Sequence, residues 1–191
     1  MKHLVLVSLI SICLICQIRA DDGQAIILKA GFRDVILGED LSAINGLVKT
    51  GKSEDYSTYK RTTDILTLGK TPLDSITYSF WNGKLAMIRL QRKTSVLTNE
   101  MNQLTEFTNS VYGKPTKINR DGNPGATVHI FKTIWEDNDT VILYTAIMTD
   151  PSPPVDSFGH VDLSIVIKSK EIEGQIMKAK GAMNVHSPTG I

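Results

Sequence analysis

The sequence predicts an α+β fold: an antiparallel sheet with one long and one short helix packed on one face. Two observations predict it. Segment 95–112 has the apolar spacing of an amphipathic helix, and most other apolar segments alternate with polar residues and are joined by short turns. Parallel strands would need helical crossovers between them, which this order of elements does not provide. The order also allows two similar halves, each a helix followed by four strands.

The first half is built mainly of strands. Its expected elements are, in chain order, a strand at 25–37, a short helix at 41–47, a polar loop at 49–55, and strands at 56–62, 64–68, 75–81 and 84–91. We expect Asp40 to cap the short helix, because an aspartate side chain accepts hydrogen bonds from the first backbone N–H groups of a helix.

The turn at Asn82-Gly83 is the clearest hairpin signal, because both residues readily adopt positive φ angles. A two-residue turn would pair Phe80 with Leu85 and put Ile88 on the face opposite Tyr78. A three-residue loop with a bulge at its glycine would instead align the apolar residues of both strands on one face. We favour the bulged loop for that reason.

The second half opens with the best helix of the chain. Leu97, Met101 and Leu104 begin an apolar stripe along 95–112, and a glycine and a proline follow the last apolar residues and end the helix. The remaining elements are expected, in order, as strands at 116–119, 127–135, 140–148 and 160–168, with a proline-rich loop at 150–159 and a weak helix at 170–180. We divide the chain into a signal peptide at 1–20, a single domain at 21–180 and a flexible tail at 181–191.

Residues 1–20 have the pattern of a cleaved secretory signal peptide. A basic start, an apolar run from Leu4 to Cys16, and Ala20 before two acidic residues fit this pattern, and the run is shorter than a membrane span. A retained membrane anchor is the alternative. Both cysteines lie within this segment, so the chain after Ala20 has none. We therefore expect a periplasmic or secreted protein with no transmembrane segment after cleavage, and favour the bacterial periplasm.

Charge balance and motif content argue against several function classes. Lys+Arg 21 against Asp+Glu 20 gives a net charge of +1, too small for a protein that coats nucleic acid. The chain has no glycine-rich phosphate loop, no paired-histidine metal motif and no nucleophile elbow. His129, His160 and His186 are far apart and would form a metal site only if the fold brought them together. We therefore expect no cofactor and no metal, and we favour a protein that is not an enzyme.

Six residues are candidates for a protein interface: Trp81, Arg89, Arg92, Trp135, Pro153 and Phe158. A basic patch is indicated by Arg89, Arg92 and Lys93 at the end of one strand, with Lys60 and Arg61 on another. The two tryptophans lie at strand ends, where aromatic side chains can anchor an interface. The last two residues lie in the proline-rich loop. The alternatives are an ordinary solvated strand face and tryptophans that cap the core.

Turn and core residues between Phe32 and Trp135 carry a resemblance to known proteins. They are Phe32-Arg33, Gly38, Tyr59-Lys60-Arg61, Asp64, Leu66, Leu68-Gly69, Ile76, Tyr78, Phe80, Gly83-Lys84-Leu85, Ile88 and Tyr112-Gly113-Lys114-Pro115. In these residues the chain resembles a group of secreted proteins of Gram-negative bacteria whose function is not assigned, which implies a periplasmic α+β domain. By shape, the expected fold is also similar to the small outer-membrane-assembly lipoproteins and to the tandem fold of the β-lactamase inhibitory protein. A likeness of fold does not determine function.

The leading hypothesis is a non-enzymatic periplasmic protein that binds another envelope or secreted protein, in the manner of an inhibitor. Its expected contact surfaces are the polar face of the sheet and the loop at 150–159. One alternative is an envelope-associated structural or assembly factor. A second alternative is a hydrolase with an unusual site, which would need a concave cluster containing a carboxylate or histidine of perturbed pKa.

Overall fold

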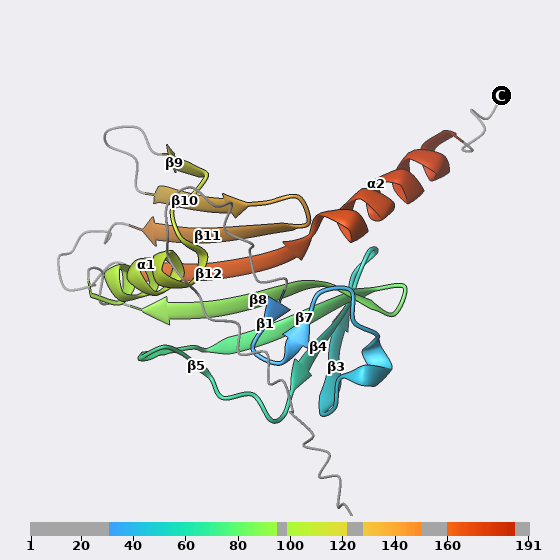
Figure 1. The fold of residues 1–191 in the computed structure, drawn as a ribbon, viewed down its shortest axis with the longest axis horizontal. Helices are drawn as coiled ribbons and strands as arrows, with labels where there is room; N and C mark the ends of the chain where they lie inside the picture. Colours follow the sequence, from blue (N-terminus) through green and yellow to red (C-terminus); the bar gives the residue numbers. More distant parts are fainter. Residues whose placement is uncertain (1–30, 95–98, 122–127, 150–159, 186–191) are drawn as a thin grey trace, which may run out of the picture.

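One antiparallel sheet dominates the computed structural model, which describes residues 31–94, 99–121, 128–149 and 160–185. Its strands are β3 (Leu47–Lys52), β4 (Ser57–Arg61), β7 (Ser75–Trp81), β8 (Lys84–Thr94), β9 (Lys117–Asp121), β10 (Val128–Glu136), β11 (Thr140–Thr149) and β12 (His160–Ser169). They pair in the order β3-β4-β7-β8-β12-β11-β10-β9, and every neighbouring pair is antiparallel. The α+β class with an antiparallel sheet is therefore confirmed (Figure 1).

Each half of the chain supplies four neighbouring strands of this sheet. The last strand of the first half, β8, pairs with the last strand of the second half, β12, in the middle of the sheet. Their pairing runs from Val161 opposite Thr94 to Lys168 opposite Met87. Because the halves join through their last strands, β3 and β9 become the two edges, at opposite ends of the sheet in Figure 1.

The first half does not form the helix predicted at 41–47. A single 3-10 turn, η1 (Leu41–Ala43), takes its place, because Gly46 turns the chain with a φ of 77° and β3 begins directly after it. Asp40 precedes η1 but makes no capping hydrogen bond. Its carboxylate instead lies 3.0 Å from the Nζ atom of Lys84.

The polar loop predicted at 49–55 is also wrong, because β3 occupies most of it. Every residue of β3 after Leu47 is exposed, so the strand shows no apolar alternation that could be read from the sequence. Two short hairpins lie beside the main sheet: β1 (Gly31–Phe32) with β2 (Val35–Ile36), and β5 (Thr67–Leu68) with β6 (Thr71–Pro72).

The β7–β8 hairpin has a two-residue turn, not the three-residue loop that we favoured. Trp81 pairs with Lys84, and the φ angles of Asn82 and Gly83 are 47° and 79°, as this tight turn requires. A bulge follows at Ala86, where the register shifts by one residue. Beyond the bulge the apolar side chains of both strands again share one face, so the predicted face is right and only the place of the bulge is wrong.

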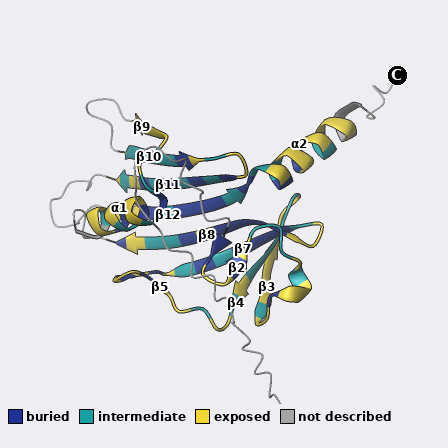
Figure 2. Cartoon of the chain, viewed as in Figure 1, coloured by how far each residue is buried: buried dark blue, intermediate teal, exposed yellow. Residues whose placement is uncertain are grey.

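Apolar side chains on one face of the sheet form the main core. Its most buried members include Ile76, Tyr78, Leu85, Ile88, Trp135, Ile142 and Ile167. Helix α1 (Asn99–Tyr112) covers part of this face with Leu104 and Tyr112. The buried residues, dark blue in Figure 2, follow the middle strands of the sheet. The helix ends where Gly113, with a φ of 74°, donates its N–H to the carbonyl of Asn109 over 2.8 Å.

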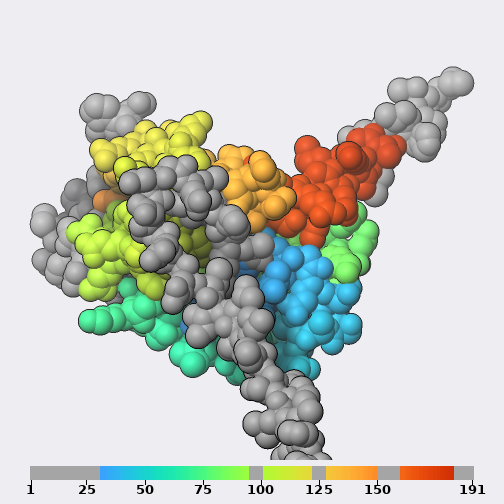
Figure 3. Space-filling view, in the orientation of Figure 1, coloured from blue at the N-terminus to red at the C-terminus, as the bar shows by residue number. Residues whose placement is uncertain are grey.

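Helix α2 (Lys170–Val185) is attached differently. Ile172 and Ile176 pack against Ala86 in a small cluster of their own, with Tyr56 and Trp81 around it, which we call the α2 cluster. The helix then projects beyond the body of the protein (Figure 3). The predicted pair of one long and one short helix on one face is not confirmed: the helices have 14 and 16 residues and bury their side chains in different clusters. Helix α2 also continues through 181–185, where a flexible tail was predicted.

The predicted signal peptide at 1–20, the loop at 150–159 and the end of the chain from 186 lie outside the described residues. Among the helices that are described, none is long and apolar enough to cross a membrane.

Candidate functional site

The face of the sheet opposite the main core, here called the outer face, carries a row of apolar residues beside an arginine. Strand pairing places Arg89 opposite Val166, Val166 opposite Leu143, and Leu143 opposite Ile134. Directly paired residues of antiparallel strands have side chains on the same face, about 5 Å apart. The row therefore crosses the four strands β8, β12, β11 and β10 without a break.

Two further rows of the outer face add apolar residues: one lies next to this row, and the other is separated from it by the polar row of Gln91, Ser164, Thr145 and Lys132. Ile147 lies opposite Ile130 on β10, and Val141 lies opposite Lys168 on β12. We define the outer patch by its apolar residues: Ile130, Ile134, Val141, Leu143, Ile147 and Val166. They belong to neither the main core nor the α2 cluster. Most of these side chains are half-buried, while that of Ile147 is 37% exposed.

Charged side chains lie both around and within the outer patch, since Lys132 stands between Ile130 and Ile134 on the same face of β10, and Asp162 lies opposite Ile147. Lys93 lies 3.7 Å from Asp162, and Lys132 lies 3.7 Å from Asp121, so these cations already face a carboxylate. Arg89 differs, because it is exposed beside Val166 and pairs with no carboxylate in the part of the chain that the structure describes. The outer patch thus consists of one apolar row, flanked by rows that contain charged residues, with one cation available to an acidic group.

The structure separates the sequence-predicted interface residues. Arg89 lies on the outer face, whereas Arg92 pairs with Leu163 on the core side, and its Nη1 atom lies 3.2 Å from Asp74. Side chains an odd number of residues apart in a strand point to opposite faces. Arg89 and Lys93 therefore share the outer face, whereas Arg92 lies on the core side, so the predicted basic patch is divided between the two faces of the sheet.

The two tryptophans also have different surroundings. Trp81 is half-buried beside the α2 cluster. Trp135 is only 1% exposed, donates its Nε1–H to the carbonyl of Gly113 over 2.9 Å and packs against the ring of Tyr112. It caps the core where α1 ends and is removed from the candidate interface. Pro153 and Phe158 lie outside the described residues.

The sequence analysis predicted strands β10 and β11 but did not identify their apolar residues as candidates for an interface. The signal was present, because Val141, Leu143 and Ile147 alternate with Ile142 and Tyr144 in one almost unbroken apolar run. Such a run indicates a strand that is apolar on both faces, rather than one with a wet face.

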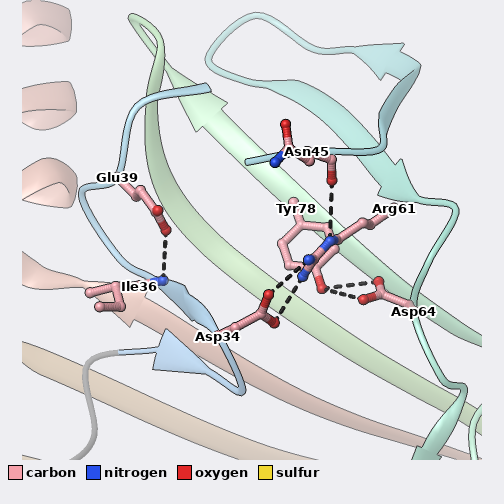
Figure 4. A network of polar contacts seen from close by, with 7 residues as sticks. All are labelled: Asp34, Ile36, Glu39, Asn45, Arg61, Asp64 and Tyr78. Atoms are coloured by element: carbon pink, nitrogen blue, oxygen red, sulfur yellow. Dashed lines mark hydrogen bonds and ion pairs between the residues drawn. The ribbon is translucent and has the colours of Figure 1, made fainter. Parts of the chain in front are cut away.

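A polar network joins the β1–β2 hairpin to the end of β4 (Figure 4). The Arg61 guanidinium donates to both carboxylate oxygens of Asp34, over 2.8 and 2.7 Å, which holds the pKa of Asp34 below its usual value. The buried Tyr78 hydroxyl lies 3.0 and 2.9 Å from the two oxygens of Asp64, whose pKa is raised chiefly by desolvation. These groups are engaged with one another, so the network fastens the hairpin to the sheet.

A groove of about 440 Å³ opens where β8 and β12 separate. The pairing of β8 with β12 ends at Met87. The residues of β8 before Met87 instead bond to the segment that precedes η1, where Gly38 donates its N–H to the carbonyl of Leu85 over 2.7 Å. The groove is lined by Leu37, Gly38, Lys84, Asp139, Thr140, Ser169, Glu171, Ile172 and Gln175.

In the described ranges no group of three or more His, Cys, Asp and Glu residues could hold a metal ion.

Comparisons with family models, with curated proteins and with solved structures found no match to this chain.

Proposed function

We propose that this chain is a non-enzymatic periplasmic protein that binds another envelope or secreted protein through its outer patch. The observation that carries the proposal is the row of Arg89, Val166 and Leu143, continued by Ile134 across four strands. Val166, Leu143 and Ile134 form an apolar row with charged residues in the rows on either side, and an apolar centre with a polar rim is the usual anatomy of a protein interface.

The shape of the outer patch favours a protein over a small molecule. Neighbouring strands are about 4.8 Å apart, so the row is roughly 14 Å wide, and it lies on a sheet face rather than in a cavity. A partner of comparable flatness would remove Ile147 and its neighbours from water, and burial of apolar surface contributes roughly 25 cal/mol per Å².

Arg89 specifies the chemistry of the partner. It is an exposed cation in the same row as three apolar side chains, so the best complement is a protein surface with a carboxylate next to apolar residues. The proposed compartment is supported by the signal-like segment at 1–20 and by the resemblance to secreted proteins of Gram-negative bacteria.

The test compares retention of envelope proteins by the wild type and by an outer-patch variant, Arg89→Glu with Ile147→Asp. The matched control is Lys70→Glu with Ile65→Asp, which makes the same kinds of change at exposed positions away from the patch. We expect the wild type and the control to retain the same envelope protein. Calorimetry with that purified partner should show that it binds the outer-patch variant at least about tenfold more weakly than the wild type. Equal binding by all three proteins would exclude the outer patch as the binding surface.

Cell fractionation tests the compartment separately. Release of the mature protein by osmotic shock is expected for a periplasmic binding protein. Recovery in the membrane fraction would instead favour the envelope-associated assembly factor.

A further inference from the structure

Strand β9 is the last strand in the order of the sheet, and its outer edge has no strand partner among the residues that the structure describes. It lies along the upper rim of the molecule, in yellow, in Figure 3. An exposed edge presents unpaired N–H and C=O groups, so it either repels other chains or pairs with one. The side chains of β9 indicate which of these applies.

The charges of β9 match those of a second, antiparallel copy of the strand. With Asn119 on a two-fold axis perpendicular to the sheet, Lys117 of one copy lies opposite Asp121 of the other, and this pair occurs twice. On the other face, Ile118 lies opposite Arg120. Ile118 is 61% exposed, and Arg120 already lies over the ring of Phe131 at 6.0 Å. No like charges face each other in this register.

The opposite edge of the sheet shows what a self-repelling strand looks like. The charged residues of β3 are Lys49 and Lys52, with no acidic residue between them. A bulge between Lys49 and Gly51 also interrupts its pairing with β4. Two copies of β3 would therefore bring like charges together along an irregular edge, whereas two copies of β9 bring opposite charges together along a regular one.

We propose that the β9 edge binds the β9 edge of a second copy of this chain, with Asn119 on the two-fold axis, so that the two sheets become continuous. The axis keeps both outer faces on the same side, and the two outer patches then belong to one surface. This inference goes beyond the proposed function and does not depend on it, because the contact uses the strand edge rather than the outer patch.

Sedimentation equilibrium with two charge reversals, Lys117→Glu and Asp121→Lys, tests the proposal. Each reversal alone turns both attractive pairs into repulsive ones, so we expect each variant to dimerise about tenfold more weakly or worse than the wild type. An equimolar mixture of the two variants restores opposite charges in both pairs, because the new carboxylate of one variant faces the new ammonium group of the other. The mixture is therefore expected to form heterodimers. The matched control, Lys52→Glu on β3, is expected to dimerise like the wild type.

The mixture separates loss of the contact from loss of the fold, because a misfolded variant would not regain dimerisation. A wild-type protein that sediments as a monomer at every concentration would overturn the proposal. So would single variants that dimerise as well as the wild type, or a mixture that remains monomeric.

Discussion

The two helices have similar lengths but are held to the protein by different forces. Helix α1 places Leu104 in the main core, and Thr108 is fully buried on the same stripe. Helix α2 buries Ile172 and Ile176 in a far smaller cluster and adds polar contacts. Helix α1 is thus held mainly by apolar packing, and α2 largely by a few polar contacts, which we call its tethers. Local opening of α2 should therefore cost less free energy than local opening of α1.

The tethers of α2 are few and specific. The Tyr56 hydroxyl donates to Glu173 over 2.6 Å, Lys168 lies 3.3 Å from the same carboxylate, and Lys180 lies 2.7 Å from Asp55. They connect the helix to β12 and to the turn before β4, and Lys170 at the start of the helix forms a further ion pair with Glu136 of β10. Each can be removed without opening the main core.

The largest effect is expected from Leu104→Ala. Leu104 is 2% exposed beneath α1, so truncation leaves a cavity and should lower the free energy of unfolding by about 2–5 kcal/mol. Urea unfolding measures the change. Met177→Ala on α2 is the control, because this side chain is 69% exposed, and its effect should stay within about 0.5 kcal/mol. Equal losses would abolish the contrast between the helices.

Ile176→Ala should have a smaller and more local effect. The side chain is 5% exposed, but its cluster is small and the helix can detach, so we expect a loss of about 1–2 kcal/mol. Amide hydrogen exchange should show faster exchange in α2 and unchanged protection in α1. If protection fell equally in both helices, α2 would be part of the same cooperative unit as the core.

Glu173→Gln should change the titration of one tyrosine only. Desolvation first, and then the hydrogen bond and charge of Glu173, raise the pKa of Tyr56, whereas burial alone raises the pKa of Tyr112 in α1 to about 12. Ultraviolet absorbance should therefore show the Tyr56 pKa falling in the variant, with Tyr112 unchanged. A fall at both tyrosines would point to general loosening.

The raised pKa values of the tyrosines also determine how the stability of the fold changes at alkaline pH. A folded tyrosine with a raised pKa contributes stability that is complete below the unfolded pKa, about 10, and is lost as the pH rises towards the folded pKa. Stability should accordingly fall above about pH 10, and Glu173→Gln should reduce the share of that fall due to Tyr56.

The smallest effect is expected from Lys180→Ala. Its ion pair with Asp55 is exposed to solvent, and such pairs contribute little to overall stability. We expect no measurable change in unfolding, but faster hydrogen exchange in the last turns of α2. Unchanged exchange there would show that this tether does not hold the helix.

The parts predicted from the sequence are those with a strong apolar period. The stripe of α1, the β7–β8 hairpin and strand β12 have it, whereas β3 is polar because it forms an exposed edge. The two-residue turn was missed because a bulge at Ala86 aligns the two strands as well as a bulge at Gly83 would. At the candidate site, Arg89 was identified, but its neighbours come from β10 and β11, and only strand pairing brings them together.

The extra residue at Ala86 makes the length of β8 a constraint on how its sequence can change. Leu85 and Ile88 are three positions apart, yet both belong to the main core, because the bulge between them reverses the alternation of the strand once. A surface loop tolerates insertions and deletions, but one residue gained or lost here would turn half of β8 inside out. Descendants of this chain can therefore exchange the side chains along β8 more freely than they can change its length.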